Sequence, residues 1–185
     1  MRRSLIFLVR ACAVLALIAP PVHAQVRTNE EAAVIAVAVS HMVHLLRAND
    51  GVPPGQVRFD PRVLESRQIQ NPAHSGYATI YELGGLRPDS VSAAATGLMA
   101  AEIGNFDDAR VCATESLRSC TLRDAVALFA SGTPTIGADS AELVVQAMWL
   151  GDLAKQPVQD GIFHVTLRRD GSGWKAIATR TLRIS

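Results

Sequence analysis

The chain has 185 residues, of which 49% are hydrophobic, and its 18 basic residues are balanced by 17 acidic ones. This length suits one globular domain rather than two, and no low-complexity tract indicates disorder. The balanced charge lacks the basic excess of nucleic-acid-binding proteins, so the sequence argues against that class of function.

The first 24 residues have the layout of a secretory signal peptide. Arg2 and Arg3 form a basic start, residues 4–19 are mostly apolar, and residues 22–24 resemble a small-residue cleavage site. An uncleaved membrane anchor is the alternative, but the apolar run is shorter than the roughly 20 residues that a span needs. We therefore expect cleavage before Gln25 and an exported protein, either periplasmic or secreted.

Cleavage would leave residues 25–185 as a single domain. Three arginines leave with the leader, so the net charge of the mature chain is about −2. Its only cysteines, Cys112 and Cys120, are expected to form a structural disulfide, because a redox-active pair favours the closer Cys-x-x-Cys spacing. No second hydrophobic run approaches the length of a membrane span, so no span is expected after the leader.

Residues 28–48 predict an amphipathic helix. Thr28 followed by Glu31 is a capping box, which places the helix start at residue 28. At 100° per residue, the apolar side chains occupy one half of the helix and are expected to be buried. These are Val34, Ile35, Ala38, Val39, Met42, Val43, Leu45 and Leu46. The polar half contains Ser40, His44 and Arg47, with His41 at the border.

The middle of the chain gives weaker signals. Residues 56–64 alternate briefly and predict a short extended element. Residues 65–88 are rich in turn dipeptides and predict loops, with one short strand or helical turn around residues 77–83. Asp89 or Ser90 is expected to cap a second helix that runs to about residue 103 and ends at the following glycine and asparagine.

Four β-favouring runs follow at residues 125–130, 141–150, 162–169 and 174–184, separated by turn clusters. The last two runs predict an antiparallel hairpin whose apolar residues alternate onto one face. That face consists of Phe163, Val165, Leu167, Trp174, Ala176 and Ala178. The opposite face consists of Ile162, His164, Thr166, Arg168, Lys175 and Thr179. Helices followed by such a meander predict an α+β domain, with N-terminal amphipathic helices packed on a curved antiparallel sheet.

The closing segment, GIFHVTLRRDGSGWKAIATRTLRIS, contains a strand, an Asp-Gly turn, a Trp-Lys pair and a final strand. Together with the long N-terminal helix, it resembles the nuclear-transport-factor-2-like superfamily over about half of the mature chain. The resemblance implies a curved sheet around a conical pocket, in families that range from enzymes to binding or dimerisation modules. It also leaves a homodimer open. It assigns no catalytic residue, because no catalytic motif position matches.

Histidines and carboxylates offer few candidates for chemistry. His41 and His44 have a spacing that can share a metal ion, but no third ligand follows at helical spacing, so no metal site is expected. His74 lies in a turn-like segment and His164 on the polar side of its strand, where exposure is the simpler interpretation. Asp107 and its neighbour Asp108 would point in opposite directions on an extended segment, so they are not expected to share a proton or a metal.

Tyr77, Tyr81 and Trp149 are the candidate pocket residues, although packing aromatics would explain them equally well. No nucleophile, metalloprotease or phosphate-binding motif occurs, so no catalytic residue and no cofactor are expected. The leading hypothesis is an exported non-enzymatic domain that binds a small apolar ligand or a protein partner in a sheet-lined concavity. The alternative is a small cofactor-independent hydratase, isomerase or hydrolase, which would use a buried histidine or aspartate with one of the tyrosines.

Overall fold

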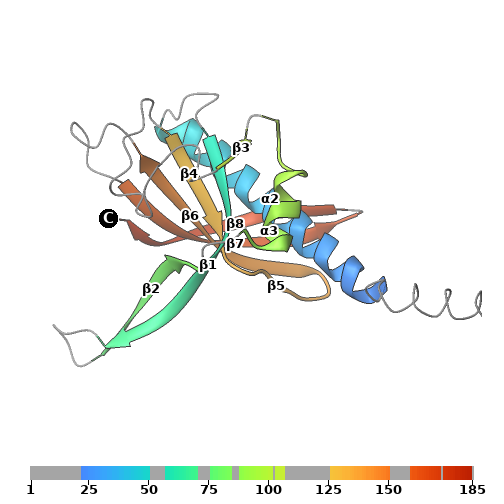
Figure 1. The fold of residues 1–185 in the computed structure, drawn as a ribbon, viewed down its shortest axis with the longest axis horizontal. Helices are drawn as coiled ribbons and strands as arrows, with labels where there is room; N and C mark the ends of the chain where they lie inside the picture. Colours follow the sequence, from blue (N-terminus) through green and yellow to red (C-terminus); the bar gives the residue numbers. More distant parts are fainter. Residues whose placement is uncertain are drawn as a thin grey trace, which may run out of the picture.

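Two helices and eight strands make up the part of the chain that the computed structural model describes (Figure 1). The described residues are 22–50, 57–70, 76–84, 88–101, 103–106, 126–150, 159–171 and 173–184. The elements are α2 (Val22–Asp50), β1 (Val57–Gln70), β2 (Tyr77–Leu83), α3 (Ser90–Thr96), β3 (Ile103–Asn105), β4 (Val126–Ser131), β5 (Thr135–Ile136), β6 (Ser140–Leu150), β7 (Gln159–Asp170) and β8 (Gly173–Ile184). The α+β class predicted from the sequence is therefore confirmed.

The strands form one mixed sheet in the order β2-β1-β4-β6-β7-β8, with β3 beside β1 and β5 beside β6. Strands β4, β6, β7 and β8 pair antiparallel in succession, which confirms the predicted meander. Strand β1, however, pairs parallel with both β3 and β4, so a purely antiparallel sheet is wrong. Parallel neighbours are joined by long connections, and alternation of apolar residues does not reveal the direction of pairing.

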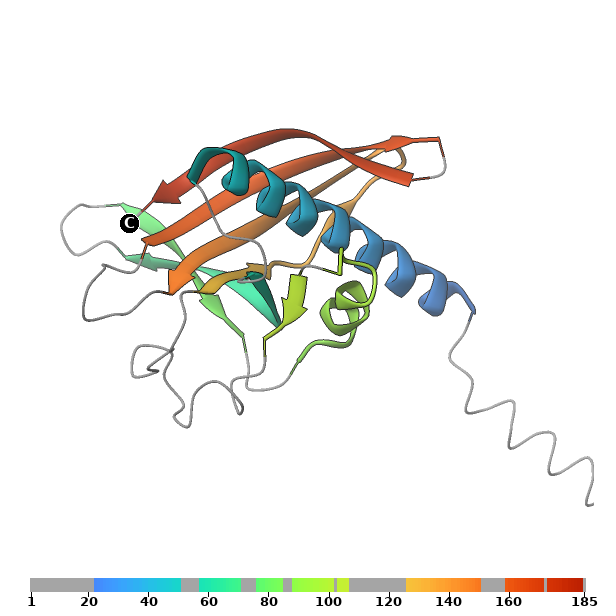
Figure 2. The same ribbon diagram turned by 90° about the horizontal axis from the view of Figure 1, so that it is seen from above.

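Helix α2 lies across one face of this sheet, where it contacts β4, β6, β7 and β8 (Figure 2). Its predicted apolar face is confirmed, and Leu45 and Leu46 pack partly buried at its edge, while His44 is exposed. The fully buried members are Val34, Ile35, Ala38, Val39, Met42 and Val43. The predicted start at Thr28 is wrong: the helix begins at residue 22, because residues 22–27 contain no glycine or proline to stop it.

The core lies between α2 and the sheet. From the sheet it contains Val57 and Phe59 of β1, together with Phe129 of β4. The remaining strand side chains buried there include Ala127, Ala141, Leu143, Val145, Phe163, Val165 and Leu167. A second small cluster on the other face joins Phe106 to Leu128. Both faces of the central strands are thus partly covered, which the sequence pattern did not predict.

By length and composition alone, the segment Thr28–Asn49 of α2 could cross a membrane, since its mean hydropathy is 1.4. From the sequence, this segment was predicted to be an amphipathic core helix and not a membrane span. Its apolar side chains are buried against the sheet, so packing in the core accounts for its composition. The expected lack of a membrane span in the mature chain stays a prediction.

Helix α3 begins where the sequence predicts and ends earlier. Asp89 is its N-cap, and its Oδ2 accepts hydrogen bonds from the backbone N–H groups of Val91 and Ser92, both at 3.0 Å. The helix ends at Thr96 before Gly97, so the predicted extension to about residue 103 is wrong. Gly97 is the C-cap, and its backbone N–H donates to the carbonyls of Ala94 and Ala95.

The hairpin of β7 and β8 has the predicted apolar face over most of its length. Phe163, Val165 and Leu167 are buried, but Thr179 rather than Ala178 faces the helix. The cause is a register shift: Thr166 pairs with Ala178 while the next residue of β7 pairs with residue 176, which leaves one extra residue in β8. Ile162 was expected on the polar side; it is fully buried, because the opposite face also carries packed side chains.

Several predictions fall on residues that are not described. Most of the predicted leader, the disulfide between Cys112 and Cys120, and the roles of His74 and of Asp107 with Asp108 all lie there. The predicted cleavage point before Gln25 falls within α2, and the structure does not test it. They stay predictions.

Candidate binding pocket

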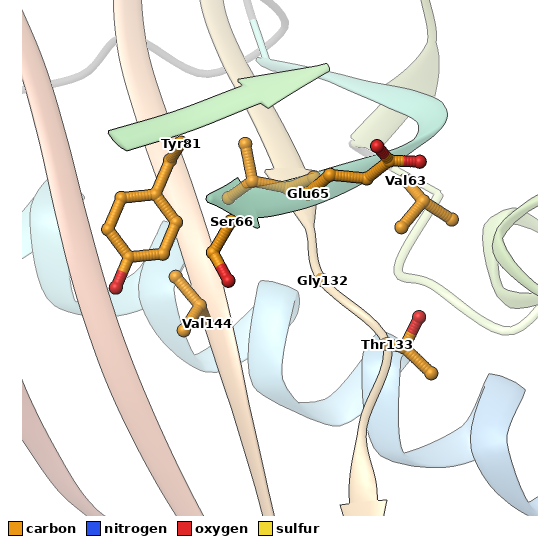
Figure 3. A pocket seen from close by; sticks show the side chains of 8 residues that line it. Val63, Glu65, Ser66, Tyr81, Gly132, Thr133 and Val144 are labelled. Atoms are coloured by element: carbon orange, nitrogen blue, oxygen red, sulfur yellow. The ribbon is translucent and has the colours of Figure 1, made fainter. Parts of the chain in front are cut away.

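An open pocket of about 410 Å³ lies where the β1/β2 hairpin separates from the rest of the sheet (Figure 3). We call the hairpin, formed by residues 64–70 of β1 and Tyr77–Leu83 of β2, the arm. The pocket joins the base of the arm to the end of β4 and to β6. Its lining consists of Val63, Leu64, Glu65, Ser66, Tyr81, Gly132, Thr133 and Val144.

A bend in β1 creates the pocket. The first part of β1 pairs with β4 and the second with β2, and the register shifts between Phe59 and Val63. Within the bend, Asp60 is buried and holds Arg62 in a bidentate ion pair, with Nη2 at 2.5 Å from Oδ2 and Nε at 3.0 Å from Oδ1. Pro61 has no N–H for the ladder, and its carbonyl accepts from the backbone N–H of Asp89 at 2.9 Å. These contacts fix the direction in which the arm leaves.

Gly132 permits the close approach of β1 and β6 on the other side of the pocket. Its N–H donates to the carbonyl of Val144 at 2.8 Å. A Cβ at this position would lie 3.2 Å from the Leu64 carbonyl oxygen, tighter than ordinary contact. The glycine therefore lets the pocket walls come together.

The lining combines apolar and polar side chains. Tyr81 and Ser66 are opposite each other in the β1/β2 register, and Figure 3 shows both beside Val144 at one end of the pocket. Thr133 lies at the other end. The Glu65 side chain packs against Gly84, in the space that a Cβ there would occupy, and its carboxylate points away from Tyr81.

The structure separates the three predicted pocket residues. Tyr81 is half-buried and lines the pocket. Tyr77 lies four residues back on the same strand, is 77% exposed and does not line this pocket. The backbone of Trp149 pairs with Ala127 in β4 and with Gln159 in β7, at the far end of β6 from Val144, and its side chain is not described.

Two of the histidines have partners. His41 is half-buried, and its Nε2 lies 3.1 Å from the Thr179 hydroxyl, so α2 and β8 are joined by a polar contact. Burial, followed by the nearby charge of His44, lowers the pKa of His41 below 6.5. His164 lies 3.4 Å from a carboxylate oxygen of Glu142 and is half-buried rather than fully exposed.

The described residues do not assemble a metal or triad site. No three histidine, cysteine, aspartate or glutamate side chains gather among them in a way that could hold a metal ion. The pocket has hydroxyls from Ser66, Thr133 and Tyr81, but within the described chain none is hydrogen-bonded to a histidine or carboxylate that could take its proton. The only carboxylate in its described lining is that of Glu65, which is exposed.

Sequence reasoning found one lining residue of this pocket, Tyr81, and missed the other seven. The wall residues are 63–66 on one strand, residues 132–133 after another, and Val144 on a third. Gly132 and Thr133 lay inside a predicted turn cluster, which was the local signal for these two residues. The chain matches no family model, no curated protein and no solved structure.

Proposed function

We propose that this chain is an exported, non-enzymatic interaction domain that binds a protein partner at the arm pocket. In this proposal an apolar side chain of the partner sits between Tyr81 and Val144, while its backbone or polar groups meet the Ser66 and Thr133 hydroxyls. A nuclear-transport-factor-2-like relationship, which the closing hairpin suggests, is part of the same proposal.

One observation carries most weight: the helix-facing side of the sheet is filled by core side chains. In a conical fold that face would hold a small ligand, but here Val39, Met42 and Phe129 are among the residues that occupy it. An open pocket lies instead at the arm, on the sheet's periphery. A filled sheet face favours an interaction module over an internal ligand cavity.

The openness of the pocket favours a protein over a small apolar molecule. Small-ligand sites commonly bury most of the ligand, which an open pocket cannot do, whereas a partner's side chain arrives with its own protein cover. The arm extends the surface beyond the pocket: Tyr77, Thr79 and Tyr81 alternate onto one face, with Gln68 donating to the Thr79 hydroxyl at 2.8 Å. This face is uncharged and suits a polar, uncharged rim on the partner.

Photo-cross-linking in the native host tests the proposal. A benzophenone amino acid at position 81 should give one discrete protein adduct in the export compartment, and Val144→Asp should abolish it. The control for the probe is the same amino acid at Leu98, an exposed apolar position directly after the C-cap of α3. The control for Val144→Asp is Thr135→Asp, at an exposed position of β5.

Two results would contradict it. The first is a small molecule that the purified protein retains in native mass spectrometry and that Val144→Asp releases, while cross-linking gives no protein adduct. That result would show that the pocket binds a small ligand and not a protein partner. An adduct that survives Val144→Asp would move the contact away from the pocket.

A further inference from the structure

Strand β8 ends the sheet on the side opposite the arm. It is 12 residues long and pairs only with β7 in the described part of the chain, so its outer edge offers unpaired backbone groups (Figure 1). Such an edge is a template for a further strand, and proteins normally protect it.

Three large apolar side chains of β8 are exposed: Ile177 by 49%, Leu182 by 36% and Ile184 by 73%. Ile177 and Leu182 are the extra residues of two register shifts against β7. Between them, residues 178–181 pair regularly with β7, from Thr166 back to Phe163. The shifts therefore leave a short, regular stretch of β8, residues 178–181, to which a further strand could pair, with an exposed apolar side chain at each end.

The sheet face opposite α2 is cationic here. Lys175 of β8 is directly opposite Arg168 of β7, and both are exposed. Like charges opposite each other are unfavourable in a sheet unless an anion compensates them. Arg180 adds a third exposed cation, and within the described residues none of the three forms an ion pair with a carboxylate.

The other two arginines of this hairpin are already engaged. Arg169 pairs with Glu30 of α2 and lies over the Trp174 ring at 4.4 Å from its centroid. Arg183 donates to Asp160 at 2.5 Å. Strand β8 itself contains no acidic residue, so the charge available to a binding partner is positive.

We propose that the β8 edge binds a short, extended, acidic segment of another protein by strand addition. The partner's backbone would pair along residues 178–181, its carboxylates would meet Lys175 and Arg180, and its apolar residues would cover Ile177 and Leu182. A second copy of this chain fits poorly, because pairing β8 with itself would bring two cationic strands together. This site is separate from the arm pocket and does not depend on it.

The test uses the mature ¹⁵N-labelled protein and a short capped peptide of alternating glutamate and valine. At low salt, the peptide should shift the backbone amides of residues 178–181 and protect those that point away from β7, and added salt should weaken binding. Arg180→Glu should weaken it by about tenfold or more, whereas Arg67→Glu, at an arginine of the arm that is also exposed, should leave it unchanged.

Other outcomes overturn the proposal. Equal binding of a peptide with lysine in place of glutamate would show apolar adhesion without charge recognition. Dimerisation through β8 in sedimentation would assign the edge to a second copy. Binding to phosphatidylglycerol vesicles without any peptide binding would assign the cations and apolar residues to a membrane surface. None of these results bears on the arm pocket, whose cross-linking test can fail or succeed independently.

Discussion

Met42→Ala tests the packing of α2 on the sheet most directly. Met42 is fully buried at the centre of the helix's apolar face, and its sulfur lies 4.0 Å from the Thr179 hydroxyl. Removing the three heavy atoms beyond Cβ forfeits roughly 2 kcal/mol of transfer free energy. Because a long helix and a sheet can collapse only partly, a residual cavity of about 50 Å³ adds roughly 1 kcal/mol. We expect the free energy of unfolding to fall by about 3 kcal/mol.

The measurement is urea denaturation of the mature chain, followed by tryptophan fluorescence and circular dichroism at pH 8. For a domain of this size, such a loss lowers the melting temperature by about 6–12 °C. His44→Ala is the matched control, because His44 is exposed on the same helix and should change stability by less than about 0.5 kcal/mol. A loss below about 1 kcal/mol for Met42→Ala, or a larger loss for His44→Ala, would refute the helix orientation.

Three further predictions follow from burial and covalent chemistry. Val165→Asp should lower the free energy of unfolding by more than about 4 kcal/mol and leave the protein insoluble, because it buries an unpaired carboxylate. Thr166→Asp, on the other face of the strand, should stay soluble. Equal solubility of the two variants would contradict the predicted alternation of buried and exposed residues. The pKa of His41 is lowered in the folded state, so the unfolded chain binds the proton more readily and stability should decline as pH falls below 6.5. His41→Asn should flatten this decline in urea midpoints, and an unchanged slope would assign it to other groups. Peptide mapping without reductant should find Cys112 bonded to Cys120, and reduction should cost roughly 2–3 kcal/mol; two free thiols in exported protein would reject the bridge.

The sequence correctly predicted those elements whose buried and exposed sides follow from the spacing of their own apolar residues. The buried face of α2, the N-cap Asp89 and the alternation of β7 are of this kind, because each is specified within a few residues of sequence. The predictions were wrong where the pairing with a neighbouring strand determines which side chains face the core. Thr179 faces the helix because β8 carries one residue more than β7 opposite it, and nothing in the sequence of β8 alone indicates that shift.

The pocket could not be predicted for a related reason. Its walls join Leu64, Tyr81, Gly132 and Val144, which come from four segments that meet only through the parallel pairing of β1 with β4. That pairing spans a long stretch of chain, and apolar alternation is the same for parallel and antiparallel neighbours. Tyr81 was selected as an aromatic residue, without any indication of what would lie against it.

The bend in β1 shows how a local signal and a distant one combine to form the candidate site. Asp60 accepts from the backbone N–H of Arg62 at 2.9 Å as well as from its guanidinium, and Pro61 between them interrupts the ladder. Both contacts of Asp60 and the interruption by Pro61 are specified by the tripeptide itself, so the sequence contains the turn away from the sheet. The space that the redirected strand occupies at Leu64 depends on Gly132 and Val144, which lie far along the chain. Because the bend lies outside the core between α2 and the sheet, substitutions in the arm can reshape the pocket while leaving that core intact. If the pocket is the proposed binding surface, its partner could change without rebuilding the fold, as sites carried on a scaffold commonly allow.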